Sequence, residues 1–210
     1  MKRRSAVVLG AILSLAVTST AQAQVAVGLR AGYNSAKLYV VEDEVDVSDI
    51  SARSGFHAGA DLAFGFSPMF GIQIGGAYSQ KGAKLTGFGE DVTFKSDVID
   101  VPALLVVSIP TGGNITPRLF AGGVASFEMS CKLTATSQSE DCDADNIGER
   151  KKSYFSLMAG VGVGIAAGPG SILLDVGYQY GLTNLSEDQG VNVRQDVIQA
   201  SLGFRFPLGS

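Results

Sequence analysis

Hydrophobic and polar residues alternate with a period of two along much of the chain from Val25 onward. In residues 25–34 the odd positions are apolar or aromatic, and the even positions are small or polar. Successive side chains of a β-strand point to opposite faces, so this alternation predicts a strand with one apolar face. The same pattern predicts seven further strands, at about residues 56–64, 72–79, 97–109, 117–128, 154–166, 171–182 and 193–206.

The connections between these eight strands alternate between long and short. The short ones, at 66–69, 110–116 and 167–170, each contain the turn-forming residue Pro, and the last two also contain Gly. The long ones cover about residues 35–53, 80–96, 129–153 and 183–192. Short turns at one end and long loops at the other are typical of bacterial outer-membrane barrels. The pattern therefore predicts an all-β fold, an eight-stranded antiparallel up-and-down transmembrane β-barrel.

The strand lengths and the aromatic residues agree with a membrane span. A strand of ten residues extends about 33 Å, and a tilt of about 40° projects it onto about 25 Å, the height of the apolar band of such barrels. Aromatic residues lie near both ends of the strands, where interfacial girdles form. One group comprises Tyr33, Phe56, Tyr78, Phe155 and Tyr180, and the other Phe64, Phe66, Phe70 and Phe206.

Charged residues within the strands occupy the small or polar face. Because every backbone polar group in lipid must be paired internally, the sheet is expected to close into a barrel. We therefore predict a polar network in the lumen, in which Arg30 lies between Asp61 and Arg205. With eight strands, side chains about fill the interior. The predicted network comprises Arg30, Asp61, Asp100, Asp175 and Arg205.

Alternation alone does not establish which face points outward. A soluble periplasmic barrel that binds a small ligand would place the apolar face inside. The aromatic girdles and the charges confined to the other face favour an apolar face that contacts lipid.

The N-terminal residues indicate export. Residues 1–23 contain three basic residues, an apolar run and the small-residue motif Ala21-Gln22-Ala23, and predict a cleaved signal peptide. Residues 24–210 then form one barrel domain. Without the signal peptide, 13 basic and 20 acidic residues leave a formal charge of −7. Nucleic-acid binding, which requires clustered positive charge, is therefore not expected.

Three segments resemble a known family: Tyr78–Lys84, Ile99–Pro102 and Tyr178–Asn184. With them, the chain resembles the small porin-like outer-membrane β-barrel proteins of Gram-negative bacteria. The resemblance implies a location in the cell outer membrane, contact with lipid and lipopolysaccharide, and folding by the barrel-assembly machinery. Such barrels usually end on an aromatic residue, whereas here four residues follow Phe206.

The two cysteines, Cys131 and Cys142, fall in the same predicted outer loop and are expected to form a disulfide. The acidic residues around them lack the Gly and Glu positions of a calcium loop, so neither metal nor cofactor is predicted. Divalent cations that bridge acidic loops to lipopolysaccharide phosphates remain an alternative.

The candidate catalytic residues are few. His57 is the single histidine, and without a Gly-x-Ser-x-Gly motif its pairing with a serine such as Ser79 is a weak basis for catalysis. We predict a non-enzymatic role in envelope integrity, adhesion or binding of an extracellular partner through acidic outer loops. The alternative is a narrow channel for ions or very small solutes, which the inner-face glycines favour and the strand count opposes.

Overall fold

The computed structural model describes residues 24–41, 50–87, 90–135, 138–142, 151–186 and 192–208. The predicted signal peptide and the acidic stretches 42–49 and 143–150 lie outside the described residues. No helix among the described residues is long and apolar enough to cross a membrane. Their strands are β1 (Gln24–Val41), β2 (Ile50–Gly65), β3 (Phe70–Gly87), β4 (Glu90–Ser108), β5 (Ile115–Ala135), β6 (Gln138–Asp141), β7 (Ser153–Ala167), β8 (Gly170–Gly181) and β9 (Asn192–Leu208).

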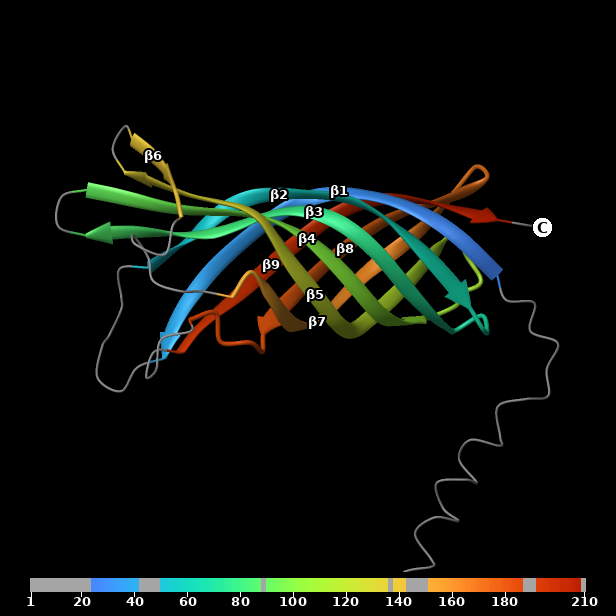
Figure 1. Ribbon diagram of the computed structural model, residues 1–210. Coiled ribbons are helices and arrows are strands. Elements are labelled where there is room, and N and C mark those ends of the chain that lie inside the picture. Colours follow the sequence, from blue (N-terminus) through green and yellow to red (C-terminus); the bar gives the residue numbers. More distant parts are fainter. Residues whose placement is uncertain are drawn as a thin grey trace, which may run out of the picture.

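Eight of these strands form a closed antiparallel ring (Figure 1). Strands that follow one another in the chain pair with each other, β5 pairs directly with β7, and β9 returns to pair with β1. The described strand β6 extends the sheet beside the outer end of β5. The predicted eight-stranded up-and-down barrel is confirmed, with one additional short strand in an outer connection.

The two ends of the barrel differ as predicted. Short turns join β2 to β3, β4 to β5 and β7 to β8 at the end where β1 starts and β9 ends. Residues Gln24 and Val25 of β1 pair there with Gly65 and Leu208. β6 lies at the opposite end, on the left of Figure 1. We call this opposite end the outer end. In the chain, the connections from β1 to β2, β5 to β7 and β8 to β9 are the longer ones, whereas only residues 88 and 89 separate β3 from β4.

The strands reach further at the outer end than the alternation predicted. The predicted loops at 35–53 and 129–153 are wrong at their edges, because β1 continues to Val41 and β5 to Ala135. The predicted loop at 80–96 is wrong over almost its whole length, because β3 continues to Gly87 and β4 begins at Glu90. The backbone ladders persist there, as in the pairing of residues 81–87 with 90–96. Beyond the apolar band both faces of a strand can be polar, so the alternation stops although the hydrogen bonds continue.

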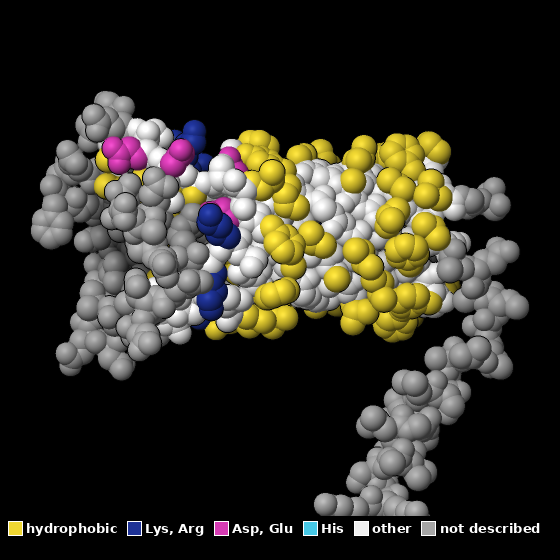
Figure 2. Space-filling view, viewed as in Figure 1, with side chains coloured by type: hydrophobic (Ala, Val, Ile, Leu, Met, Phe, Trp, Pro, Cys, Tyr) yellow, Lys and Arg dark blue, Asp and Glu magenta, His cyan; other side chains and the backbone are white. Residues whose placement is uncertain are grey.

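The side chains divide between the two faces as predicted. Leu29, Leu105 and Val161 point outward and are 57%, 63% and 57% exposed, whereas Asn34 and Gln73 point inward and are buried. Figure 2 shows hydrophobic side chains around the barrel, with charged side chains toward the outer end of the face in view. This arrangement suits a barrel surrounded by lipid and is the reverse of a soluble ligand-binding barrel.

The interior also contains a small apolar cluster that the sequence analysis did not anticipate. Leu104 and Val106 of β4 pack with Phe120 of β5, and Met158 of β7 packs against them. These residues share the inward positions with the polar side chains, so one part of the lumen is filled by apolar atoms.

Aromatic side chains occupy both borders of the outward apolar surface. Near the outer end, Tyr33 pairs in register with Phe56, and the Phe56 and Tyr78 rings lie 5.6 Å apart. Near the other end, the Phe204 and Phe206 rings lie 4.5 Å apart. These positions match the two predicted groups of aromatic residues.

The outward face provides a test of lipid contact. Leu29 lies four residues from both Val25 and Tyr33, midway along the apolar stretch of β1. We expect Leu29→Arg to lower the free energy of unfolding by about 2–4 kcal/mol, because charge at the bilayer midplane is costly. Urea unfolding in lipid vesicles, followed by circular dichroism, measures this. The control Leu182→Arg, at an exposed position beyond the outer end of β8, should cost about 0–1 kcal/mol. Equal costs would contradict the lipid-facing assignment.

Candidate functional site

The lumen holds four of the five predicted network residues together. Asp61 accepts hydrogen bonds from Arg30 at 2.9 Å and from Arg205 at 3.2 Å. Asp175 lies 3.9 Å from Arg30 and 3.5 Å from Arg118. Two aspartates therefore each bridge two arginines that come from different strands.

Gln73 links Arg118 and Arg205, the two arginines that do not share an aspartate, and so completes a closed ring of side chains. Its Oε1 accepts hydrogen bonds from Arg205 at 2.7 Å and from Arg118 at 2.9 Å. The ring draws on six strands, β1, β2, β3, β5, β8 and β9. We call it the arginine ring; in order around the circle it comprises Arg30, Asp61, Arg205, Gln73, Arg118 and Asp175.

The predicted position of Arg30 between Asp61 and Arg205 is wrong, because Asp61 itself lies between the two arginines. In the strand register, Gly28 of β1 stands opposite both Asp61 and Arg205, whereas Arg30 stands opposite Gly59 of β2. Since Gly28 has no side chain, Asp61 and Arg205 meet directly over it.

Two glycines make room for the carboxylates of the arginine ring. A Cβ atom at Gly28 would lie 2.5 Å from Oδ2 of Asp61, and one at Gly162 would overlap the carboxylate of Asp175. Gly162 belongs to a Gly-rich stretch of β7 that superficially fits a nucleotide-binding pattern. Its place in a strand beside Asp175 shows that its small size accommodates a lumen side chain.

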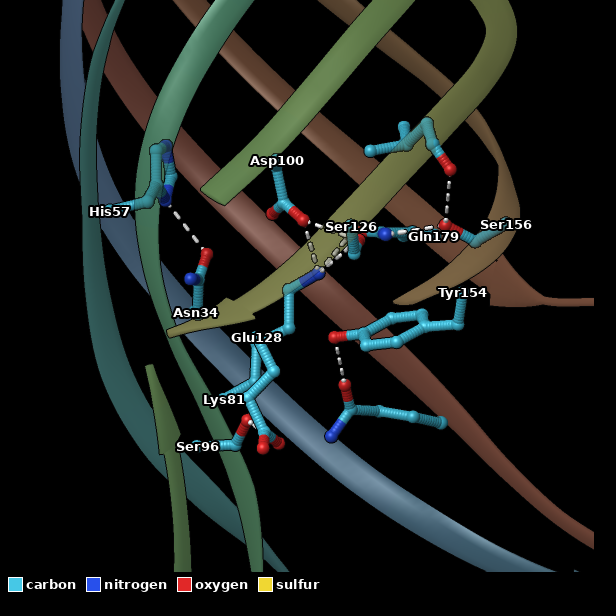
Figure 3. A network of polar contacts seen from close by, with 12 residues as sticks. Asn34, His57, Lys81, Ser96, Asp100, Ser126, Glu128, Tyr154, Ser156 and Gln179 are labelled. Atoms are coloured by element: carbon cyan, nitrogen blue, oxygen red, sulfur yellow. Dashed lines mark hydrogen bonds and ion pairs between the residues drawn. The ribbon is translucent and has the colours of Figure 1, made fainter. Parts of the chain in front are cut away.

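Asp100, the fifth predicted residue, belongs to a separate group nearer the outer end (Figure 3). Lys81 is completely buried, and its Nζ lies 2.7 Å from Oδ1 of Asp100. Lys81 also donates to Ser126 at 3.3 Å and to Gln179 at 3.4 Å. We call Lys81, Asp100, Ser126 and Gln179 the lysine cluster.

The lysine cluster crosses the lumen. Its members come from β3, β4, β5 and β8, and the ring of Tyr154 on β7 lies 5.4 Å from Nζ of Lys81. Tyr154 in turn donates a hydrogen bond to Gln195 of β9 at 3.0 Å. Side chains from six strands thus meet across the lumen at this level.

A small cavity lies between the arginine ring and the lysine cluster. Its volume is about 40 Å³, and both Asp175 of the ring and Asp100 of the cluster line it. One water molecule needs about 10–15 Å³ of such space, so the cavity has room for a few waters. The lumen in this region therefore contains a small, partly open space bordered by charged side chains of both groups.

His57 also lines this cavity. Its Nδ1 lies 2.7 Å from Oδ1 of Asn34, in a buried hydrogen bond. Ser79 stands opposite His57 in the register of β2 and β3, but its Oγ has no hydrogen-bond partner among the described residues. The His57 ring therefore hydrogen-bonds to the side-chain amide of Asn34. The expectation of a non-enzymatic role stays a prediction.

The sequence analysis missed five residues of these groups: Gln73, Arg118, Lys81, Ser126 and Gln179. Gln73 and Arg118 occupy inward positions in their strands, so the alternation was sufficient to predict that both face the lumen. Lys81 was assigned to a loop, because β3 was predicted to end at Ser79. Extending the inward alternation past Ser79 would have identified it.

Cys131 and Cys142 form a disulfide, as predicted, with their Cα atoms 5.3 Å apart. The bond fastens the chain after β6 to β5, where Lys132 stands opposite Asp141. Among the described residues, no group of three or more His, Cys, Asp or Glu side chains is placed to hold a metal ion. The acidic positions 143 and 145 lie outside the described residues.

At the outer end, the outward surface carries an ordered group of aromatic and charged side chains. Arg194 of β9 lies 4.3 Å from the ring centre of Tyr180 and 5.3 Å from that of Tyr39. The buried carboxylate of Asp196 accepts hydrogen bonds from Arg194 at 3.2 and 3.3 Å and from Tyr178 at 2.6 Å. Cation–π contacts and charge-assisted hydrogen bonds therefore fix this guanidinium.

Comparison with known proteins establishes the class of this protein. Residues 20–187 match the family model described as "Outer membrane protein beta-barrel domain". The chain belongs to this family and is an integral β-barrel protein of the outer membrane. No curated protein matches the chain.

Solved outer-membrane barrels are similar in structure. OprG from Pseudomonas aeruginosa is 14% identical, with 88% of this chain and 96% of OprG covered and a TM-score of 0.53. Neisserial surface protein A is 17% identical, and the match covers 87% of this chain and 99% of that protein with a TM-score of 0.48. Ail, the attachment invasion locus protein of Yersinia pestis, was solved in complex with the heparin analogue sucrose octasulfate. It is 20% identical, and the match covers 87% of this chain and 99% of Ail with a TM-score of 0.47. Of these three, the likeness to OprG supports the fold, and the fold alone.

The lysine cluster provides a stability test. We expect Asp100→Asn to lower the free energy of unfolding by about 3–5 kcal/mol, because it leaves the buried ammonium of Lys81 without its carboxylate. Urea unfolding followed by circular dichroism measures the loss. The double variant Lys81→Met/Asp100→Asn should recover most of it. A double variant as unstable as the single one would contradict the assignment of the loss to an unpaired charge.

The disulfide provides a second test. Closing a loop of about 12 residues is worth on the order of 3 kcal/mol in the chain-entropy model. Because the closed loop consists of the outer end of β5, β6 and the residues between them, we expect Cys131→Ser/Cys142→Ser to speed amide exchange in β6 and the end of β5. Exchange in β1 and β9 serves as the internal control and should stay unchanged. Faster exchange throughout the ring would show that the disulfide supports the whole barrel.

Proposed function

We propose that this protein is a non-conducting outer-membrane barrel that acts through its outer loops, in envelope integrity, adhesion or partner binding. The observation that carries the proposal is the pair of polar layers across the lumen, the arginine ring and the lysine cluster. Both consist of buried or half-buried side chains from several strands that pair with each other in the lumen.

The energetics of these layers favour a closed lumen. Ion movement through the barrel would require Lys81 to leave Asp100, or the arginines to leave Asp61 and Asp175. Separating a buried ion pair leaves charges without partners, which is strongly unfavourable. The apolar cluster around Phe120 further reduces the open cross-section.

The composition of the outer connections supports a role at the cell surface. Acidic residues occur in the three longest of them, at 42–49, 140–149 and 187–188. These segments contribute much of the negative charge of the chain. Such loops suit a partner that offers cationic groups or divalent cations, which bind carboxylate oxygens.

Planar-bilayer conductance of the purified, refolded protein tests the closed lumen. We expect no conductance steps from wild-type protein whose folding and insertion are verified by circular dichroism and heat-dependent gel mobility. The variant Lys81→Ala/Arg118→Ala should give steps, because it removes a side chain from each layer. The matched variant Lys84→Ala/Lys95→Ala removes two exposed cations and should stay silent. Steady, salt-proportional steps from the wild type would contradict the proposal and favour the narrow channel.

The role of the loops is tested in cells. In a strain without the gene, we expect a variant with its acidic residues at 42–49 changed to amides to insert normally but not to restore the barrier to a hydrophobic dye or surface adhesion. The double variant Lys81→Met/Asp100→Asn, altered in the lumen, should restore both. Restoration by the loop variant would argue against these loops as the functional surface.

A further inference from the structure

The arginine ring has an unbalanced charge. It contains three arginines, Arg30, Arg118 and Arg205, but two carboxylates, Asp61 and Asp175. The charges of the neighbouring lysine cluster do not offset the excess, because Lys81 and Asp100 balance each other. One positive charge in the ring therefore lacks a counter-charge.

The excess is located on one side of the ring. Around the circle, each pair of arginines is separated by one acceptor, which is a carboxylate at two places and the neutral amide of Gln73 at the third. The Nη2 atoms of Arg118 and Arg205 lie 2.9 and 2.7 Å from the same Oε1 of Gln73. Two guanidinium groups thus converge on one uncharged oxygen.

The unused hydrogen-bond donors belong to the same three residues, Gln73, Arg118 and Arg205. Among the described residues, the buried side-chain nitrogens without a hydrogen-bond partner are Nε2 of Gln73, Nε and Nη1 of Arg118, and Nε of Arg205. Gln73 and Arg118 are 1% and 4% exposed, so bulk solvent does not satisfy these groups. Asp175 Oδ1 also lacks a hydrogen bond, but it lies 3.5 Å from Nε of Arg118, within ion-pair distance.

We propose that the lumen binds one small monovalent inorganic anion, of the chloride class, beside Gln73, Arg118 and Arg205. The anion supplies the missing negative charge, and it accepts hydrogen bonds from N–H groups that the protein leaves unpaired. Its size is limited because the side chains of the ring already contact one another.

The proposal makes Gln73 the residue that creates the site. A carboxylate at this position would complete the alternation of positive and negative side chains around the ring. Gln73→Glu changes one atom of nearly equal size and supplies that charge, so it should replace the anion. Gln199→Glu is the matched control, because Gln199 lines the cavity between the arginine ring and the lysine cluster but is not part of the ring.

The test compares thermal unfolding of the protein, folded in detergent micelles, in sodium chloride and in sodium gluconate at equal ionic strength. We expect chloride to raise the unfolding temperature of the wild type by about 3 °C or more, because a ligand bound to the folded state stabilises it. Gln73→Glu should be more stable than the wild type in gluconate and should lose the chloride effect. Gln199→Glu should keep the chloride effect.

A second variant and a direct probe complete the test. Arg205→Gln removes a positive charge, whereas Gln73→Glu adds a negative one. Both changes balance the charge of the ring, so Arg205→Gln should also abolish the chloride effect. In crystals grown in bromide, the anomalous signal should lie within hydrogen-bond distance of Arg118 or Arg205. Coincident wild-type curves in the two salts, with no bromide signal, would overturn the proposal and leave water as the partner of these N–H groups. A chloride effect that persists unchanged in Gln73→Glu would equally overturn this location.

Discussion

The hydrogen-bonded ladder between β1 and β9 is the contact on which the rest of the structure depends. It joins the first strand of the barrel to the last, from Val25–Leu208 to Val41–Asn192. An unpaired backbone group in lipid costs several kcal/mol, so an open edge of this length is not tolerated. Closure also brings Arg205 to Asp61, since these residues lie on opposite sides of β1.

The closed wall explains why the lumen is organised in pairs of charges. Eight strands leave an interior that side chains about fill. Charged side chains inside it have little or no access to bulk water, so each is stabilised by partners from other strands. Glycines at positions such as 28 and 162 provide the space for these contacts. In the proposed function, a partner binds at the outer end, where the strand extensions and the disulfide lie.

Much of the fold follows from the alternation of residues. It identifies all eight barrel strands and separates the two faces of each strand. The aromatic girdles and the charges confined to one face then indicate which face points outward. The alternation fails at the outer strand ends, as at residues 80–87, where both faces are polar and only backbone pairing defines the strand. It also misses β6, whose four residues are too short to show a period.

The sequence by itself determined which residues face the lumen, because a strand of period two separates its side chains by parity. The tertiary structure decided which of them meet. Strands tilt and are staggered in a closed barrel, so residues distant in sequence, such as Lys81 and Gln179, reach the same level. Whether a residue occupies an odd or an even position in its strand does not say how far along the barrel axis its side chain lies. For this reason Asp100 pairs with Lys81 rather than with the arginines, and Gln73, a neutral residue, completes their ring.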